Sequence, residues 1–257
     1  MVEAITQVKK LEVRELSIRY GDQIALHSAS FDVREHEIFG IIGPANSGKT
    51  SFLRAINRMN EMTPGMNVTG MVKFDGIDVK SWRDVYALRS RIGVVFPLPV
   101  GLPLSVYDNV ALSPRLSGVK SKSELDDIVE RCLTRAALFD EVKDRLDSLG
   151  SLLSGGQQQR LTIARALSQS PELLLLDEFS IAVDPVTTMR IEDVLKELKK
   201  EVTIVLVSNL VAQARRLADR TAFFLGGELV EVGETEELFR GNVQDSRTTD
   251  YLEGRFG

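Results

Sequence analysis

The sequence predicts an α/β protein with a mostly parallel sheet, an N-terminal antiparallel β-layer and an inserted helical region. Apolar runs that alternate with amphipathic stretches indicate strands and helices joined in β-α-β order. Residues 10–42 show short alternating runs separated by turn signals, a pattern typical of antiparallel strands. Residues 97–159 show helical patterns almost throughout. We therefore expect a helical insertion that interrupts an α/β core.

The composition is that of an ordinary globular protein. The 257 residues carry a net charge of −5, which argues against a nucleic-acid partner. The apolar run at 173–176 is far shorter than the roughly 20 residues that span a bilayer, and the start MVEAITQVKK lacks a signal-peptide core. We expect a soluble, cytoplasmic protein that meets a membrane only through partners. Cys132 is the sole cysteine, so we expect no intrachain disulfide and a small buried hydrophobe.

Residues 10–42 contain the runs LEVRELSIRY, IALHSASFDV and IFGII, which predict two strands of a β-layer and the first core strand. Gly21 and Asp22 mark the turn between the first two runs. Tyr20 ends the first run beside this turn, where its ring could face a base. An ordinary aromatic at a strand edge is the alternative.

The segment GPANSGKT, residues 43–50, matches the P-loop pattern Gly-x-x-x-x-Gly-Lys-[Ser/Thr]. It lies between an apolar strand and a helix predicted over 51–62, which is the order that the pattern needs. Such a loop surrounds a triphosphate with backbone N–H groups at a positive helix end. A plain glycine turn before a helix is the alternative.

Each P-loop position has an expected role. Gly43 and Gly48 permit the tight turn, Lys49 would reach the β- and γ-phosphates, and the Thr50 hydroxyl would bind Mg²⁺. The predicted nucleotide-binding residues are Tyr20, Gly43, Pro44, Ala45, Asn46, Ser47, Gly48, Lys49, Thr50 and Ser51.

The next stretch leads into the helical region. MVKFDGIDV, residues 71–79, predicts a hairpin whose turn is Asp75-Gly76. A calcium site at Asp75 and Asp78 is disfavoured because the other ligand positions are missing. RIGVVF, residues 91–96, predicts a buried strand. The following PLPVGLPL predicts a stiff connector, since its prolines continue neither strand nor helix.

Three runs predict the helices of the helical region: SVYDNVAL, SKSELDDIVERCLTRAALF and EVKDRLDS. Ser121 or Ser123 would cap the middle helix. We expect a single domain over 1–257 with internal parts. These parts are a P-loop core part with the β-layer at 8–96, a helical subdomain at 97–159, the rest of the core at 160–240 and a C-terminal tail at 241–257.

The core resumes with a helix over 155–168. PELLLLDE and VTIVLVSN predict buried parallel strands on either side of a helix at 185–200. TAFFLGGELVEVG predicts a closing hairpin, followed by a short helix at 234–240 and a polar tail. Ligands of such sheets bind at the carboxyl ends of the strands.

Two further motifs suggest phosphate chemistry. LLLLDE ends in two acids, of which Asp177 would hold Mg²⁺ through water and Glu178 would polarise an attacking water. An unpaired buried carboxylate is costly, so adjacent acids at the end of an apolar strand favour a functional interpretation. In LSGGQQQR, Ser154 could be only a helix cap. With Gly155 and Gly156 it also makes a second anion site at a helix start.

In order along the chain, GPANSGKT, LSGGQ, LLLLDE and Asp184 resemble the ATP-binding subunits of ABC transporters. The resemblance covers nearly the whole chain. SVYDNVAL, LSGGQQQRLTIARAL and the ending DYLEGRFG look like the phosphate-importer ATPase subfamily, PstB. The resemblance implies the ABC ATPase fold, with a P-loop NTPase core, and an ATPase that uses ATP and Mg²⁺.

The resemblance also implies a head-to-tail pair of ATPase subunits, either two copies or a mixed dimer. Tyr20 would stack on adenine, Glu178 would be the catalytic base with Lys49, and Asp184 would communicate across the interface. The ATP of one chain would be contacted by the other chain's signature residues Ser154, Gly155, Gly156 and Gln157. Closure on ATP would drive transmembrane permease subunits, with a solute-binding protein as an indirect partner, from the cytoplasmic face of the inner membrane.

This sequence departs from the family pattern at two functional positions. Pro97 stands where the family has a glutamine that joins the γ-phosphate site to the membrane partner. Asn209 stands at the catalytic position where the family has a histidine that contacts the γ-phosphate. The two histidines, His27 and His36, fall in the β-layer, so we expect them to be solvated or locally bonded.

Three smaller departures lie in the phosphate-site motifs. Asn46 replaces a usual glycine of the P-loop, and Phe179 and Ile181 replace the usual proline and serine after Glu178. Asn tolerates positive φ better than most residues, so the turn is expected to survive.

We therefore expect an importer ATPase of the phosphate type with reduced hydrolysis. Loss of a positioned γ-phosphate contact can cost ~10²–10³ in rate, by analogy with oxyanion-hole donors. The alternative is an ATP-binding regulatory or dimerisation subunit with little turnover. A relative that acts on ribosomes or DNA would bring a second ATPase domain or a long coiled coil, and neither fits in 257 residues.

Overall fold

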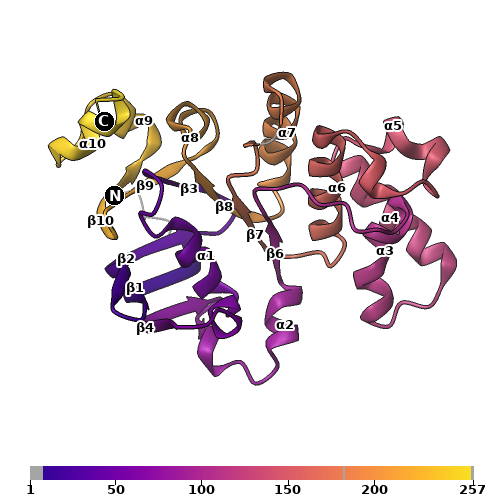
Figure 1. The fold of residues 1–257 in the computed structure, drawn as a ribbon, viewed down its shortest axis with the longest axis horizontal. Helices are drawn as coiled ribbons and strands as arrows, with labels where there is room; N and C mark the ends of the chain where they lie inside the picture. The colour runs from indigo at the N-terminus through magenta and orange to yellow at the C-terminus, as the bar shows by residue number, and fades with distance from the viewer. Residues whose placement is uncertain (1–7, 182, 256–257) are drawn as a thin grey trace, which may run out of the picture. The chain divides into compact units, whose positions relative to one another are not determined.

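The computed structural model describes residues 8–181 and 183–255. They form two compact units (Figure 1). Unit 1 is the described part of Met1–Arg89 with that of Thr203–Gly257, and unit 2 is the described part of Ser90–Val202. The P-loop lies in unit 1. The helical region 97–159 lies in unit 2, together with the strands and helices that flank it.

Unit 1 begins with the predicted antiparallel layer. Its strands follow the order β5-β4-β1-β2, with the bounds β1 Lys9–Tyr20, β2 Gln23–Arg34, β4 Met66–Phe74 and β5 Ile77–Asp78. Asp75 and Gly76 join β4 to β5 with φ of 49° and 75°, as the two-residue hairpin turn requires. The predicted hairpin is confirmed, although β4 starts earlier than residue 71.

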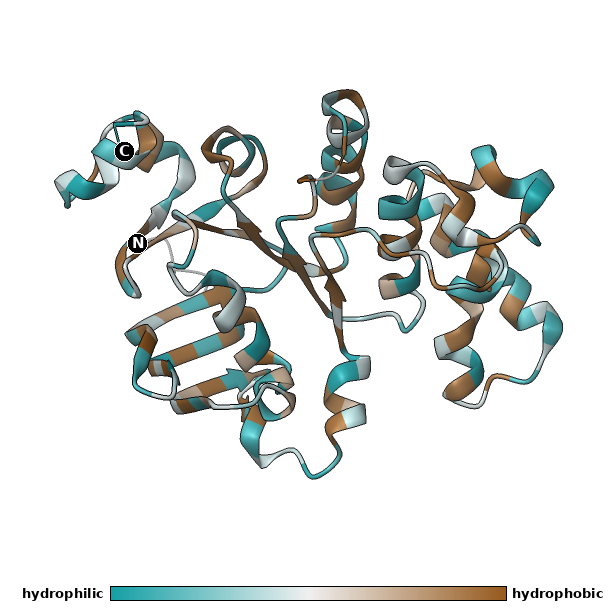
Figure 2. Cartoon of the chain, in the orientation of Figure 1, coloured by the Kyte–Doolittle hydropathy of each residue, from teal (hydrophilic) through white to brown (hydrophobic). Residues whose placement is uncertain are grey.

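The remaining strands of unit 1 place the P-loop. β3 Ile38–Ile42 pairs in parallel with both β8 Thr203–Ser208 and β9 Arg220–Leu225, and β9 turns at Gly226-Gly227 into antiparallel β10 Glu228–Glu234. Every residue of β3 and β8 is buried. Figure 2 shows these strands as apolar along their length, whereas β1 and β2 are banded. The continuous apolar runs of the sequence thus form the buried parallel strands, and the alternating runs form the antiparallel β-layer.

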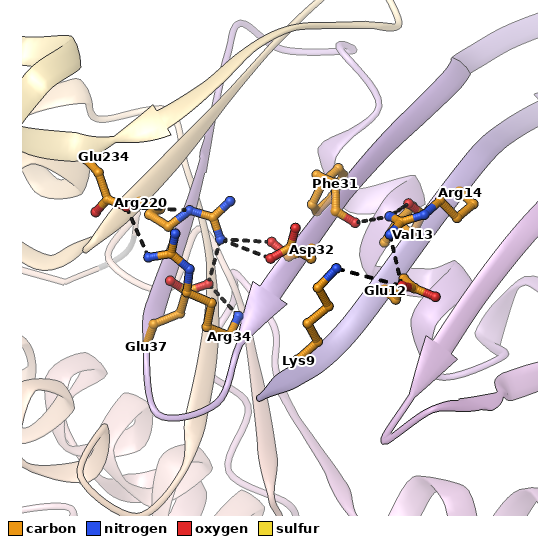
Figure 3. Close-up of polar contacts among 10 residues, drawn as sticks. All are labelled: Lys9, Glu12, Val13, Arg14, Phe31, Asp32, Arg34, Glu37, Arg220 and Glu234. Atoms are coloured by element: carbon orange, nitrogen blue, oxygen red, sulfur yellow. Dashed lines mark hydrogen bonds and ion pairs between the residues drawn. The ribbon is translucent and has the colours of Figure 1, made fainter. Parts of the chain in front are cut away.

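A charged network ties these strands together at the start of β3 (Figure 3). Glu37 accepts from the Arg34 backbone N–H at 2.6 Å, and the Arg220 guanidinium lies 3.3 Å from the same carboxylate. Arg220 also approaches Asp32 at 3.5 Å, and Arg34 pairs with Glu234 at 3.0 Å. Burial raises the pKa of Glu37. The network joins residues up to 200 positions apart, which no local pattern could predict.

The helices of unit 1 correct several expectations. The helix after the P-loop, α1, runs only over Lys49–Ile56, because Asn57 caps it and Arg58 turns left-handed at φ 59°. A 3₁₀ turn follows at Met59–Met62. Short helices that the sequence did not indicate are α2 Val85–Ser90, which ends at the unit boundary, and α8 Val211–Leu217. The predicted short helix is α9 Thr235–Phe239.

The expected polar tail contains a helix, α10 Ser246–Leu252. Its Tyr251 ring stacks on Phe223 with 4.7 Å between ring centroids. Glu231 accepts from the Gln244 backbone N–H at 2.8 Å and from the Thr248 hydroxyl at 2.8 Å. The polar tail therefore holds a helix that its sequence did not indicate, and one aromatic stack and one carboxylate dock that helix on unit 1.

Unit 2 pairs β6 Ile92–Val95 in parallel with β7 Leu173–Asp177. Its helices are α3 Val106–Leu116, α4 Lys122–Arg135, α5 Phe139–Val142, α6 Gly155–Leu167 and α7 Pro185–Leu198. Ser121, not Ser123, caps α4. Ala137, at φ 51°, separates α4 from α5, so the predicted middle helix is broken near its end. Cys132 is buried in α4 as expected.

Candidate phosphate-binding site

In the P-loop, the lysine side chain folds back onto the backbone of the loop itself. Lys49 Nζ donates to the carbonyl oxygens of Gly43 at 2.8 Å and Pro44 at 2.7 Å, and the side chain is 4% exposed. Gly48 precedes α1 at φ 97°, and a Cβ there would lie 2.3 Å from the Ala25 carbonyl oxygen. Only glycine can therefore bring the chain round into α1 so close to β2.

The start of α1 suits an anion. The N-cap Gly48 supplies no side-chain hydrogen bond to the first turn, and no acidic residue lies in that turn, so the positive helix end carries no negative charge of its own. The Ser47 hydroxyl oxygen is buried in the loop without a hydrogen-bond partner. A buried unpaired hydroxyl costs free energy that a ligand oxygen would recover. Asn46 adopts φ 62°, so the asparagine accepts the left-handed turn where the family has glycine.

Tyr20 lies beside the P-loop. Its hydroxyl is 3.1 Å from the Ser51 hydroxyl in the first turn of α1, and the ring is half-buried at the end of β1. The structure therefore brings the predicted aromatic and the loop together within unit 1. Thr50, the predicted magnesium ligand, follows Lys49 on α1 and is partly exposed.

The two acids of LLLLDE have different environments. Asp177 ends β7 and is 4% exposed, whereas Glu178 is partly exposed and adopts φ 44°. A left-handed backbone at a glutamate is uncommon and directs the chain sharply out of the strand. Phe179 is fully buried, so it fills core space where the family has proline. Ile181 is 63% exposed.

The segment Ser154–Gln157 starts α6 with a capping box. Ser154 Oγ accepts from the Gln157 backbone N–H at 3.4 Å, and Gln157 Oε1 accepts from the Ser154 N–H at 3.2 Å. A Cβ at Gly156 would lie 2.6 Å from the Thr187 methyl group on α7. Packing against α7 therefore requires a glycine at position 156, whether or not this segment binds a ligand.

Asp184 is the N-cap of α7. Its carboxylate accepts from the Thr187 backbone N–H at 2.9 Å, and hydrogen bonds from the Thr187 side chain and backbone hold the pKa of Asp184 below its usual range. The aspartate is therefore ionised at neutral pH and fixed at a helix start.

A buried amide that the sequence reasoning missed shapes the connector 97–104, which forms neither helix nor strand as predicted. Asn109, fully buried in α3, accepts from the Leu102 N–H at 2.9 Å and donates to the Ser105 carbonyl at 2.8 Å. Arg165 reaches it from α6 at 3.1 Å. The asparagine in SVYDNVAL could have been singled out, since a polar residue on the apolar face of a helix needs partners.

The two departures at functional positions, Asn209 and Pro97, reach the surface. Asn209 is exposed directly after β8, and Pro97 is partly exposed after Phe96. His27 and His36 are both exposed, as expected for solvated side chains. Neither histidine belongs to a cluster: no group of three metal-binding side chains occurs among residues 8–181 and 183–255.

The predicted site residues therefore form two groups. Unit 1 brings together Tyr20, the P-loop and Ser51, with Asn209 at the end of a strand beside β3. Unit 2 carries Asp177, Glu178, the Ser154–Gln157 segment and Asp184. Across the part of the chain that the structure describes, no helix is long and apolar enough to cross a bilayer.

Comparisons with known proteins identify the family and the fold. A sequence profile of the family described as ABC transporter matches residues 26–180. The fold is similar to that of CbiO1 from Clostridium perfringens, part of the ABC transporter complex CbiONQ. The two chains are 26% identical over 92% of each, with a TM-score of 0.80.

Two more solved structures are similar. The dimeric ATP-binding cassette MJ0796, in a post-hydrolysis state bound to ADP and Pi, is 28% identical over 88% of this chain and 98% of that one, with a TM-score of 0.75. A bacterial Atm1-family ABC exporter with ATP bound is 22% identical, with a TM-score of 0.81. The match covers 98% of this chain but only 42% of the exporter chain, and at 22% identity it concerns the fold alone.

Proposed function

The chain belongs to the ABC transporter family and is an ABC ATPase, and on that premise we propose that it is the ATPase subunit of a phosphate-type importer that turns over slowly. The P-loop geometry carries the proposal. Its glycine turn, uncapped helix start and unpaired Ser47 hydroxyl together fit a triphosphate. The importer assignment is supported by the match with CbiO1 over 92% of both chains and by the PstB-like motifs.

Each residue has a role in this proposal. Backbone N–H groups within 43–51, Pro44 excepted, bind the phosphates, and Lys49 exchanges its loop carbonyls for phosphate oxygens. Tyr20 stacks on adenine. Thr50 and Asp177 would hold Mg²⁺, a hard cation that takes hydroxyl, carboxylate and phosphate oxygens. Bound there, the ion would neutralise charge on the phosphates.

Glu178 polarises the attacking water in this scheme. Glu178 directly follows the buried strand β7 with a backbone φ of 44°, which sets the direction in which its side chain leaves the chain. The γ-phosphate is also contacted by the segment Ser154–Gln157 of a second subunit, either a copy or a related chain. The ionised Asp184 lies at that subunit interface.

Transport requires a membrane partner. We place the permease subunits at the connector 97–104, where Leu98 is 68% exposed and Val100 is 57% exposed. Apolar side chains held outward on a stiff segment favour a protein contact. The subunit would then lie on the cytoplasmic face of the inner membrane, with a solute-binding protein as an indirect partner.

The two functional departures predict slow turnover. Pro97 supplies no amide, and the exposed Asn209 carries no imidazole for the γ-phosphate. These positions also favour the second candidate function, an ATP-sensing regulatory subunit with little hydrolysis. The retained Glu178 and the capped signature segment favour the enzyme.

The test is the rate of ATP hydrolysis by the purified protein. Glu178→Gln should abolish turnover and accumulate an ATP-bound dimer, while Asn209→His and Pro97→Gln should each raise the rate. If the parent already works at ordinary importer rates and neither change matters, the slow-turnover proposal is wrong. If Glu178→Gln hydrolyses ATP like the parent, the catalytic assignment fails. Reconstitution with co-purified permease and labelled phosphate tests the solute.

A further inference from the structure

Glu141 is the centre of a polar cluster that contacts the start of α6, where the signature segment Ser154–Gln157 lies. It lies in the short helix α5, and its Oε2 accepts from Gln157 Nε2 at 2.9 Å. Arg160 donates to both carboxylate oxygens, at 2.8 Å and 3.0 Å. Arg190 on α7 lies 3.8 Å away. One carboxylate thus joins α5 to two positions of the first turns of α6.

The ion pair between Arg160 and Glu141 is geometrically strong. Two parallel N–H donations to one carboxylate make a bidentate pair. The Arg160 side chain is 4% exposed and also donates to the Ala137 carbonyl at 2.5 Å, in the turn between α4 and α5. Removing the carboxylate would leave a buried cation with only neutral partners, which is more costly than losing an exposed pair.

The contact with Gln157 fixes the helix start. The Gln157 amide has two ends: its oxygen closes the capping box on the Ser154 N–H at 3.2 Å, and its nitrogen donates to Glu141. Hydrogen bonds at both ends favour this one orientation of the amide. Hydrogen bonds from Arg160 lower the pKa of Glu141, so the acceptor stays ionised at neutral pH.

We propose that Glu141 is a positioning residue for the signature segment Ser154–Gln157. By holding Gln157 and Arg160 it keeps the start of α6 in one conformation, ready to contact the γ-phosphate of ATP bound by a second subunit. This inference rests on the proposed function, because it assumes an ATP-dependent pair. It concerns pairing and turnover only, and leaves the P-loop's own affinity for ATP unchanged.

The neighbouring Asp140 provides a matched control. It lies on the same helix, carries the same charge and has a side chain that is 92% exposed. Its ion pair is with Lys143 at 3.4 Å, three residues along. Such an exposed pair contributes little.

The experiment uses the full chain with Glu178→Gln, in which hydrolysis is blocked. Sedimentation velocity measures the ATP concentration that drives dimerisation, and the fluorescent analogue TNP-ATP measures binding to the P-loop. Glu141→Gln should leave TNP-ATP affinity within about twofold and weaken ATP-driven dimerisation about tenfold or more, the scale of a lost charged hydrogen bond. Asp140→Asn should change neither. Glu141→Asp, which keeps the charge, should recover part of the loss.

Three outcomes overturn the inference. If the Glu141→Gln variant dimerises at the same ATP concentration as the parent, the cluster does not position the signature segment. An equal loss of TNP-ATP affinity would show a general folding defect. A loss in Asp140→Asn as large as in Glu141→Gln would show an effect of net charge. If the parent with Glu178→Gln binds TNP-ATP but does not dimerise with ATP, the pair of two copies on which this inference is tested is refuted, while the ATP-binding part of the proposed function stands.

Discussion

Truncation of Asn109 tests whether one buried amide holds the proline-bearing connector. Asn109 Oδ1 accepts from the Leu102 N–H at 2.9 Å and from Arg165 at 3.1 Å. Its Nδ2 group lies 3.3 Å, 3.1 Å and 2.8 Å from the carbonyl oxygens of Leu102, Leu104 and Ser105. The substitution Asn109→Ala removes these contacts and changes no charge.

The expected cost follows from counting the lost bonds. An amide nitrogen has two hydrogens, so about two donated and two accepted bonds disappear, each worth roughly 1 kcal/mol net. Asn109 is 0% exposed, so water cannot replace the amide without local opening. Arg165 keeps its bond to the Val100 carbonyl at 3.1 Å, which limits the loss. We expect the free energy of unfolding to fall by about 3 kcal/mol.

Urea denaturation followed by far-UV circular dichroism measures this change, and hydrogen exchange of the amides in 97–104 should accelerate in parallel. The sole tryptophan, Trp82, lies in unit 1, so tryptophan fluorescence would follow the wrong unit. Asn242→Ala is the control, because Asn242 is exposed and its side chain donates to Glu237, only five residues away. A cost below about 1 kcal/mol for Asn109→Ala would refute the reasoning.

Substitutions at three further positions test the structure of unit 1. Gly48→Ala should weaken TNP-ATP binding at least about tenfold, because the added Cβ meets the Ala25 carbonyl at 2.3 Å; binding like the parent would contradict this. Tyr251→Ala should lower the free energy of unfolding by about 1–2 kcal/mol through the lost stack on Phe223, and Tyr251→Phe by less; equal losses would contradict the stacking account. Burial raises the pKa of Glu37 above 4.5, so the folded state holds the proton more tightly and stability falls as pH rises through that pKa. Urea titrations at several pH values should show Glu37→Gln gaining on the parent as pH rises above 4.5, and a constant difference would contradict the raised pKa.

The elements that the sequence predicted well are those set by local chemistry. The P-loop turn needs left-handed residues, and the positions 46 and 48 supplied an asparagine and a glycine at φ 62° and 97°. Ser154 supplied the cap of α6, and the apolar runs became fully buried parallel strands. In each case the determining residues lie within a few positions of one another. The binding and catalytic roles of these residues stay predictions.

The errors have a common physical origin. The sequence predicts a longer helix than α1 because the apolar pattern continues past Asn57, although the chain turns left-handed at Arg58. The helices α8 and α10 were missed because they are short and depend on packing partners distant in the chain. Tyr251, for example, stacks on a ring of β9.

The sequence by itself determined the family, the fold class and the position of each phosphate motif. It could not reveal the polar contacts made by Glu141 and Asn109. Glu141 looks like any acid in a helical region, and the place of Asn109 on an apolar helix face does not say which groups it contacts. Glu141 lies 16 residues before Gln157 and 19 before Arg160. Only the tertiary structure decides which polar groups are buried together, since burial makes their hydrogen bonds obligatory and gives them a role.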